Sequence, residues 1–200
     1  ELLDLYLSGE EIPEAKVKEA LRVGIMEGEL TPVMVGSATK TIGVRTLLNM
    51  LVDYLPAPDE LQPLVGKDAK TDVELTRQTH DNEPFSAYVF KTTVDPFLGQ
   101  VNYLKINSGM LRLGQEVVIS NRGENKKIST LFAPRGKMQI ECQEFHAGDI
   151  AAIAKIDGVH TGDTLADPKS QIVYEPVSLP TPVIYIAVHP KNKNDEDKIS

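Results

Sequence analysis

Cysteine and tryptophan are nearly absent from the 200 residues: there is one cysteine, Cys142, and no tryptophan. A lone cysteine cannot form a disulfide within the chain, which is typical of proteins that work in a reducing compartment. The sequence also has no run of about eighteen apolar residues and no charged-then-apolar leader. We therefore expect a cytoplasmic protein with no membrane partner.

Positive charge is also scarce, because 21 Lys and Arg residues face 29 Asp and Glu residues and leave a net charge of -8. Proteins that bind nucleic acid nonspecifically need an excess of cations to neutralise phosphates. We expect no DNA partner, and any contact with RNA must be local. The hydrophobic content of 41% suffices for a buried core in one or two domains.

The stretch 84–111 organises the second half of the chain. Residues 86–93 alternate between the two faces of a predicted strand, and residues 95–99 supply Pro and Gly for a turn. A second apolar run, 101–106, completes a predicted hairpin. Short strands separated by glycines then follow at 117–119, 127–133, 138–142 and 149–156, which predicts a closed antiparallel barrel.

The first 58 residues have helical periodicity instead. We predict helices at 1–7, from Pro13 onward with a buried stripe, and at 44–55, and a strand buried on both faces at 31–35. Helix, strand, loop and helix in this order are typical of the end of an α/β domain. Because Glu1 falls inside a predicted helix, we expect the chain to be a piece of a longer protein.

Two connecting stretches separate these parts. Periodicity fades over 57–80, where we predict a connector with one strand near 73–77. Pro176, Pro180 and Pro182 mark a second boundary. After it we predict a new strand at 183–188, followed by a polar tail.

The predicted strand 31–35 leads into a loop of small residues, Gly36, Ser37 and Ala38. Such a loop exposes backbone amides at the carboxyl edge of a sheet, where open α/β domains bind ligands. By itself the pattern is more often a plain loop.

Five motifs, taken together and in order, resemble bacterial elongation factor G. They are Gly-Ser-Ala (36–38), Val-Asp-Tyr-Leu-Pro-Ala-Pro (52–58), Pro-Phe (84–85) with Lys91 and Asp-Pro-Phe-Leu-Gly (95–99), Ala-Gly-Asp-Ile (147–150), and Thr-Gly-Asp-Thr-Leu (161–165). The resemblance implies a mixed fold. Residues 1–58 would be the C-terminal piece of an α/β P-loop GTPase domain, 59–82 a linker, 83–178 the antiparallel β-barrel second domain, and 179–200 the first strand of an α+β third domain.

The resemblance also implies a function on the ribosome, where the intact protein would couple GTP hydrolysis to translocation of tRNA and mRNA or to a related step. Its partners would be small-subunit ribosomal RNA and GTP, and its cofactors GTP and Mg. Gly36, Ser37 and Ala38 match the family motif whose backbone amides help to recognise guanine. The sequence contains no G-x-x-x-x-G-K-[ST] phosphate loop. We therefore expect no GTP hydrolysis and no tight nucleotide binding by this chain alone.

Two alternatives remain at this point. Residues 131–137 and His146 differ from the usual family sequence, which points to a paralogue, and a ribosomal protection protein is a near alternative. A free-standing β-barrel adaptor that binds protein or RNA without nucleotide chemistry is the alternative from another class.

A basic stretch in the barrel is the candidate RNA contact. It holds five cations and one acid, Glu124; the cations are Arg122, Lys126, Lys127, Arg135 and Lys137. By the resemblance, we predict that Lys126, Lys127, Arg135 and Lys137 contact ribosomal RNA phosphates. The alternative is a solvated edge strand, where lysine is common.

Neither a metal site nor a catalytic site is predicted. Cys142 and His146 have the spacing of a ligand pair, but a second pair is missing. The Asn-Lys-Asn-Asp segment at 192–195 imitates a guanine-reading motif, yet it follows the Gly-Ser-Ala loop instead of preceding it, and we interpret it as a coincidence. No nucleophile, base and orienting group occur as a recognisable set.

Overall fold

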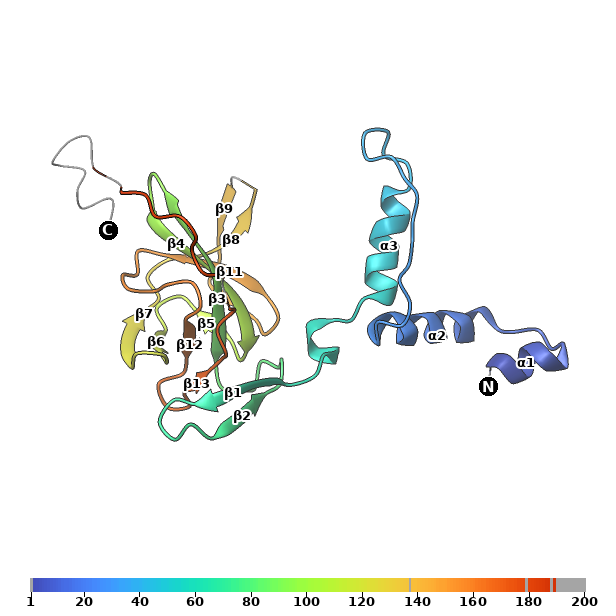
Figure 1. The fold of residues 1–200 in the computed structure, drawn as a ribbon, viewed down its shortest axis with the longest axis horizontal. Helices are drawn as coiled ribbons and strands as arrows, with labels where there is room; N and C mark the ends of the chain where they lie inside the picture. Colours follow the sequence, from blue (N-terminus) through green and yellow to red (C-terminus); the bar gives the residue numbers. More distant parts are fainter. Residues whose placement is uncertain (1, 137, 179, 188, 190–200) are drawn as a thin grey trace.

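The computed structural model describes residues 2–136, 138–178, 180–187 and 189. Figure 1 shows a helical N-terminal part and a β-rich part, joined by an extended connector. The helices are α1 (Leu2–Ser8), α2 (Glu14–Met26) and α3 (Val44–Tyr54). None of the described helices has the length and apolar character needed to cross a membrane.

The predicted helices are confirmed, together with the signals that bound them. Pro13 is the residue before α2, and Gly43 precedes α3 with a φ of 77°. The predicted buried stripe of α2 is wrong for this chain, because Leu21 is 40% exposed; Leu47 on α3 is likewise 44% exposed. Both helices therefore present apolar faces that the described residues do not cover fully.

The strand predicted at 31–35 does not form among the described residues. This stretch is extended, but its backbone makes no ladder, and Val33 and Val35 are 88% and 95% exposed. A strand needs a neighbour for its N–H and C=O groups. The apolar pattern indicated a tendency to be buried, whereas burial itself requires a partner strand.

The connector is more structured than predicted. After a 3-10 turn, Pro58–Glu60, it forms β1 (Leu64–Asp68) and β2 (Glu74–Arg77), of which the sequence predicted only β2. β1 pairs with both β2 and β13 (Ile172–Val173), in the order β13-β1-β2. Gly66 interrupts the side-chain pattern of β1, and a Cβ there would lie 2.7 Å from Ile172 Cγ1.

The β-rich part is built on one antiparallel sheet of the order β7-β6-β12-β3-β4-β11-β8-β9. Its strands, in chain order, are β3 (Ser86–Asp95), β4 (Gly99–Ser108), β6 (Glu116–Ile119), β7 (Glu124–Lys127), β8 (Leu131–Arg135), β9 (Met138–Glu141), β11 (Ile150–Ala154) and β12 (Thr164–Ala166). The predicted β3–β4 hairpin is confirmed. The strand predicted at 127–133 is wrong: it is divided between β7 and β8, with the fully buried Ile128 between them.

The sheet curls around a main apolar core, with two smaller apolar clusters besides it, and is barrel-like, although its ladder does not close among the described residues. A small pair, β5 (Leu111–Arg112) with β10 (Glu144–Phe145), lies beside the core. The Gly114 N–H also donates to the Ile128 carbonyl, at 2.7 Å. The core draws on all the longer central strands; it includes Val89, Leu104, Ile106, Ile119, Ile153 and Leu165.

Two turns attach the later strands to the β3–β4 hairpin. In the first, residues 146–149, the Gly148 N–H donates to the Ile106 carbonyl at 2.7 Å, and the Ile106 N–H donates to the Asp149 carbonyl at 2.9 Å. The His146 N–H donates to Asp149 Oδ2 at 2.9 Å, which closes the turn. Gly148 has a φ of 94°, a conformation that favours glycine. This turn leads directly into β11.

The second turn, residues 160–163, is built in the same way on the other strand of the hairpin. The Gly162 N–H donates to the Val89 carbonyl at 2.8 Å, and the Val89 N–H donates to the Asp163 carbonyl at 2.9 Å. The His160 N–H donates to Asp163 Oδ2 at 2.7 Å, and Gly162 has a φ of 96°. This turn leads into β12.

The strand predicted at 183–188 is not formed over 183–187, and residue 188 lies outside the described residues. Val183 and Tyr185 are 92% and 86% exposed. The reason is the same as for 31–35, since no described segment pairs with this one.

Candidate functional site

The loop 36–38 closes on the residues just before α3. The Ser37 N–H donates to the Ile42 carbonyl at 2.9 Å, and the Ile42 N–H donates back to the Ser37 carbonyl at 3.0 Å. The Thr41 N–H donates to the Ala38 carbonyl at 3.2 Å. The result is a tight loop that stands at the exposed end of α3, beside a hollow of about 210 Å³.

Glycine is required at both ends of this loop. A Cβ on Gly36 would lie 2.8 Å from the Ile42 carbonyl oxygen, and one on Gly43 would lie 3.0 Å from the Val35 carbonyl oxygen. Contacts this short with backbone atoms cannot be relieved by turning a side chain. The two segments therefore approach each other closely because neither carries a side chain at the crossing.

The backbone N–H groups of Ser37 and Ala38 differ in their hydrogen bonding. The Ser37 N–H is already bonded within the loop, whereas the Ala38 N–H has no partner in the described part of the chain. The Ser37 hydroxyl accepts a long bond, 3.4 Å, from the Lys40 N–H. Of these two amides, only that of Ala38 is free to donate to a ligand in the described part of the chain.

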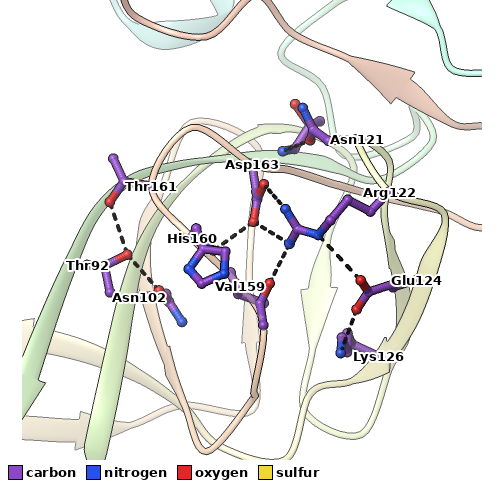
Figure 2. Close-up of polar contacts among 12 residues, drawn as sticks. Thr92, Asn102, Asn121, Arg122, Glu124, Lys126, Val159, His160, Thr161 and Asp163 are labelled. Carbon is purple, nitrogen blue, oxygen red and sulfur yellow. Dashed lines mark hydrogen bonds and ion pairs between the residues drawn. The ribbon is translucent and has the colours of Figure 1, made fainter. Parts of the chain in front are cut away.

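The predicted basic stretch has Arg122 at its start, and this residue is fully engaged with acids. Its guanidinium donates to Asp163 through Nη1 to Oδ1 and through Nη2 to Oδ2, both at 2.9 Å (Figure 2). Its Nη2 also donates to the Gly158 carbonyl, and its Nε lies 3.4 Å from Glu124. Asp163 raises the pKa of Arg122 further above its usual value, mainly through this hydrogen bonding. Arg122 therefore holds the turn 160–163 in place.

Lys126 is paired as well. Its Nζ lies 2.9 Å from Glu124 Oε2, and its side chain is 24% exposed. The hydrogen bond from Lys126 lowers the pKa of Glu124. Much of the charge on Lys126 is thus compensated within the chain, which reduces what it can offer to an external phosphate.

Lys127 and Arg135 are exposed and have no ion pair within the described residues. They do not form one patch, however. Lys127 lies on β7 and Arg135 on β8, which are near opposite ends of the strand order and on different sides of the barrel in Figure 1. Lys137 lies outside the described residues. Nearness in the sequence suggested one surface, but the chain crosses the barrel between these strands.

A chain of hydroxyls fixes the turn 160–163 to the hairpin. Thr161 Oγ1 lies 3.0 Å from Thr92 Oγ1, which donates to Asn102 Oδ1 at 2.8 Å. Asn102 is fully buried, and its Nδ2 has no partner among the described residues. These groups hold the turn 160–163 against the β3–β4 hairpin.

A polar cluster that the sequence did not predict joins the connector to the barrel. Asp81 accepts from the Ala147 N–H at 2.9 Å and lies 2.7 Å from His146 Nδ1. The hydrogen bond to Asp81 raises the pKa of His146, and the bond from Ala147 is the main cause that lowers the pKa of Asp81. Sequence spacing could not reveal the pair, because its members are separated by 65 positions.

Within the described ranges, no three side chains of His, Cys, Asp or Glu gather closely enough to hold a metal ion. Cys142 and His146 belong to separate environments, because the Cys142 thiol is near the Ile140 carbonyl and His146 is near Asp81.

Comparison with known proteins agrees with this arrangement. Residues 84–167 match the family model of elongation factor G domain 2. A protein from Thermus thermophilus, known from a crystal structure, is similar to 99% of this chain at 31% sequence identity and a TM-score of 0.72. The matched region is 27% of that protein's length. The β-rich part of this chain is thus similar to the second domain of elongation factor G.

Proposed function

We propose that this chain is part of an elongation-factor-G-like translational GTPase that acts on the ribosome. The observation that carries the proposal is the match of 84–167 to elongation factor G domain 2 within a similarity that extends over 99% of the chain. The intact protein would couple GTP hydrolysis, with Mg as cofactor, to translocation or a related step in the cytoplasm.

In this proposal each part of the chain has a separate task. Residues 1–58 end the GTP-binding domain, 59–82 link it to the barrel, 83–178 form the second domain, and 179–200 begin the third. The partly exposed apolar side chains of α2 and α3 and the unpaired stretch 31–35 support the first assignment, since no described residues cover them fully. A nucleotide-binding domain would supply parallel strands and helices to cover them.

The loop 36–38 would contact the edge of a guanine base. Its support is geometric: two glycines let backbone segments approach closely, and the Ala38 N–H is free to donate. One hydrogen bond contributes about 1 kcal/mol, so this loop would add specificity to a nucleotide that other residues hold.

The barrel would face small-subunit ribosomal RNA. Among the described residues of the predicted set, Lys127 and Arg135 are exposed and unpaired, so they would make phosphate contacts at two separate places. Phosphate contacts position a protein without reading sequence.

Co-sedimentation tests the proposal. The purified chain is mixed with separated small or large ribosomal subunits at increasing salt, and the bound fraction is measured. Saturable binding to small subunits, with weaker binding to large ones and loss at high salt, is the expected result. Equal binding to both subunits, or none at low salt, would contradict it.

A further inference from the structure

One outer face of the barrel combines aromatic rings with lysines. It lies on β3, β4 and β11, where Tyr88 is in register with Lys105 and Lys105 with Ile150. In the next row, Lys91 is in register with Tyr103. Cross-strand partners in these positions place their side chains on the same face of the sheet.

An irregularity in β3 adds a further ring to this face. The pairing shifts between Val89 and Lys91, so Phe90 has no partner on β4 and is 42% exposed. Its ring centroid lies 6.4 Å from that of Tyr103, with the two planes at 43°. Lys91 Nζ lies 5.9 Å from the Tyr103 centroid. The bulge therefore brings two rings and a cation together at the surface.

A groove runs beside these rings. It has a volume of about 530 Å³ and is mainly apolar, with Lys105 at its edge; its lining also includes Tyr88, Phe90, Asn107, Ile150 and Val177. The Val177 N–H donates to the Tyr88 hydroxyl at 3.1 Å, which fixes one wall. One acid, Glu175, also lines the groove.

We propose that Phe90, Tyr103, Lys91 and Lys105 form an RNA-binding face that takes single-stranded RNA. Exposed rings provide surfaces on which unstacked bases lie, and this stacking is independent of base identity. The flanking lysines suit the phosphates between those bases. A purely apolar partner would gain nothing from two cations among the rings, and they stand out in a chain whose net charge is -8.

The proposal depends on the proposed function only for the source of the RNA, which would be an unpaired ribosomal segment. Duplex RNA keeps its bases stacked inside the helix and cannot place them on the rings. The RNA-binding face should therefore prefer single strands. This preference separates stacking from simple attraction of phosphates to lysines.

Fluorescence anisotropy with a labelled ten-nucleotide oligouridylate measures the affinity directly. Phe90→Ala should weaken binding by about 5- to 150-fold, the range expected for losing one stacked base. Phe90→Trp should keep or strengthen binding. Phe97→Ala is the matched control, since Phe97 is a 93% exposed ring on the same hairpin, at its tip. Circular dichroism shows whether each variant is folded.

Four other results would count against the RNA-binding face. Equal losses for Phe90→Ala and Phe97→Ala, equal affinity for a duplex of the same length, or no binding at low salt would overturn the proposal. So would concentration-dependent dimers in sedimentation velocity that Phe90→Ala abolishes, because the face would then join two copies. Binding to oligouridylate without binding to small subunits would support the RNA-binding face and refute the proposed function. Binding to small subunits without binding to oligouridylate would refute the RNA-binding face and support the proposed function.

Discussion

Arg122 and Asp163 form a bidentate ion pair, with both nitrogen-to-oxygen distances at 2.9 Å. The Asp163 side chain is 8% exposed and the Arg122 side chain 35%. The same carboxylate also closes the turn 160–163 by accepting from the His160 N–H. The pair thus joins the β6–β7 hairpin to the segment that leads into β12.

Removing Arg122 should destabilise the barrel. Arg122→Ala leaves a nearly buried carboxylate without its charge partner, and we expect a loss of about 1 to 3 kcal/mol, because part of the pair is exposed to water. Urea unfolding followed by circular dichroism measures this loss. Lys127→Ala on the neighbouring strand is the control and should change stability by less than about 0.5 kcal/mol. An equal effect of the two substitutions would contradict the assigned role.

Two glycines with positive φ should differ in their tolerance of a side chain. Gly99 has a φ of 72° and open space around its missing Cβ, which confirms the predicted turn conformation, whereas a Cβ on Gly109 would lie 2.6 Å from the Glu83 carbonyl oxygen. Gly99→Val should cost about 1 to 3 kcal/mol through backbone strain alone. Gly109→Ala should cost more than Gly99→Ala.

Thermal unfolding of the three variants tests this order. Gly99→Asn serves as the control, since asparagine adopts positive φ more easily than other residues. Equal melting temperatures for Gly99→Ala and Gly109→Ala would show that the close contact at Gly109 relaxes at no cost.

The contact between His146 and Asp81 should depend on pH. Asp81 raises the pKa of His146 above its ordinary value of 6.5, so the pair's contribution to stability is complete below that value and is lost as the pH rises through the folded pKa. Because the pKa of Asp81 is lowered, its own contribution is lost in acid, as the pH falls through that pKa. An NMR titration of the His146 ring measures the shift.

Asp81→Asn should lower the pKa of His146 toward 6.5. Asp157→Asn, at another exposed carboxylate of the barrel, is the control and should leave the titration unchanged. An unaltered His146 pKa in Asp81→Asn would mean that the pair does not form in solution.

Salt dependence should distinguish the two neighbouring lysines of β7. Lys127→Ala should reduce the slope of log affinity for small subunits against log salt by about 0.7 to 0.9, the change expected for one phosphate contact. Lys126→Ala should change it less, because Glu124 already pairs with Lys126. Lys18→Ala removes a lysine that is paired with Glu14 on α2 and is the control. Identical curves for Lys127→Ala and the parent chain would reject Lys127 as a contact.

This chain alone should not hydrolyse GTP. The Gly-Ser-Ala loop can supply only a few hydrogen bonds of about 1 kcal/mol each, and their sum does not reach the roughly 4 kcal/mol of millimolar affinity. Phosphate release with and without ribosomes, and calorimetric titration with GDP, measure both properties. Turnover above that of ribosomes alone, or micromolar GDP binding, would refute this expectation.

The sequence predicted those elements whose signal is local. The β3–β4 hairpin was predicted because alternation and a Pro-Gly turn lie within one short stretch, and α3 because its apolar residues repeat at helical spacing. The strand β1 was missed because Gly66 interrupts its pattern. Residues 31–35 and 183–187 have strand composition, but composition does not supply the neighbour that a strand pairs with.

The candidate site was predictable to a similar extent. The Gly-Ser-Ala loop was predicted between a buried strand and a helix; the helix forms, but the strand does not, and the bond between the Ser37 N–H and Ile42 depends on the path of the loop. The pairing of Arg122 with Asp163 spans 41 positions, and it gives one cation of the predicted basic stretch a structural role. Long-range pairs of this kind carry no local signal.

The two turns at 146–149 and 160–163 have corresponding positions in the strand order, one on each side of the β3–β4 hairpin. On the β3 side of the hairpin, the sheet continues through β12 to the outer hairpin β6–β7. On the β4 side, it continues through β11 to the outer hairpin β8–β9, and one turn lies on each side. Lys127 and Arg135 thus lie in the outer hairpins on the two sides. A ligand that contacted both would have to reach around the barrel, whereas two separate ligands, or two segments of one long ligand, would meet similar frameworks with different side chains.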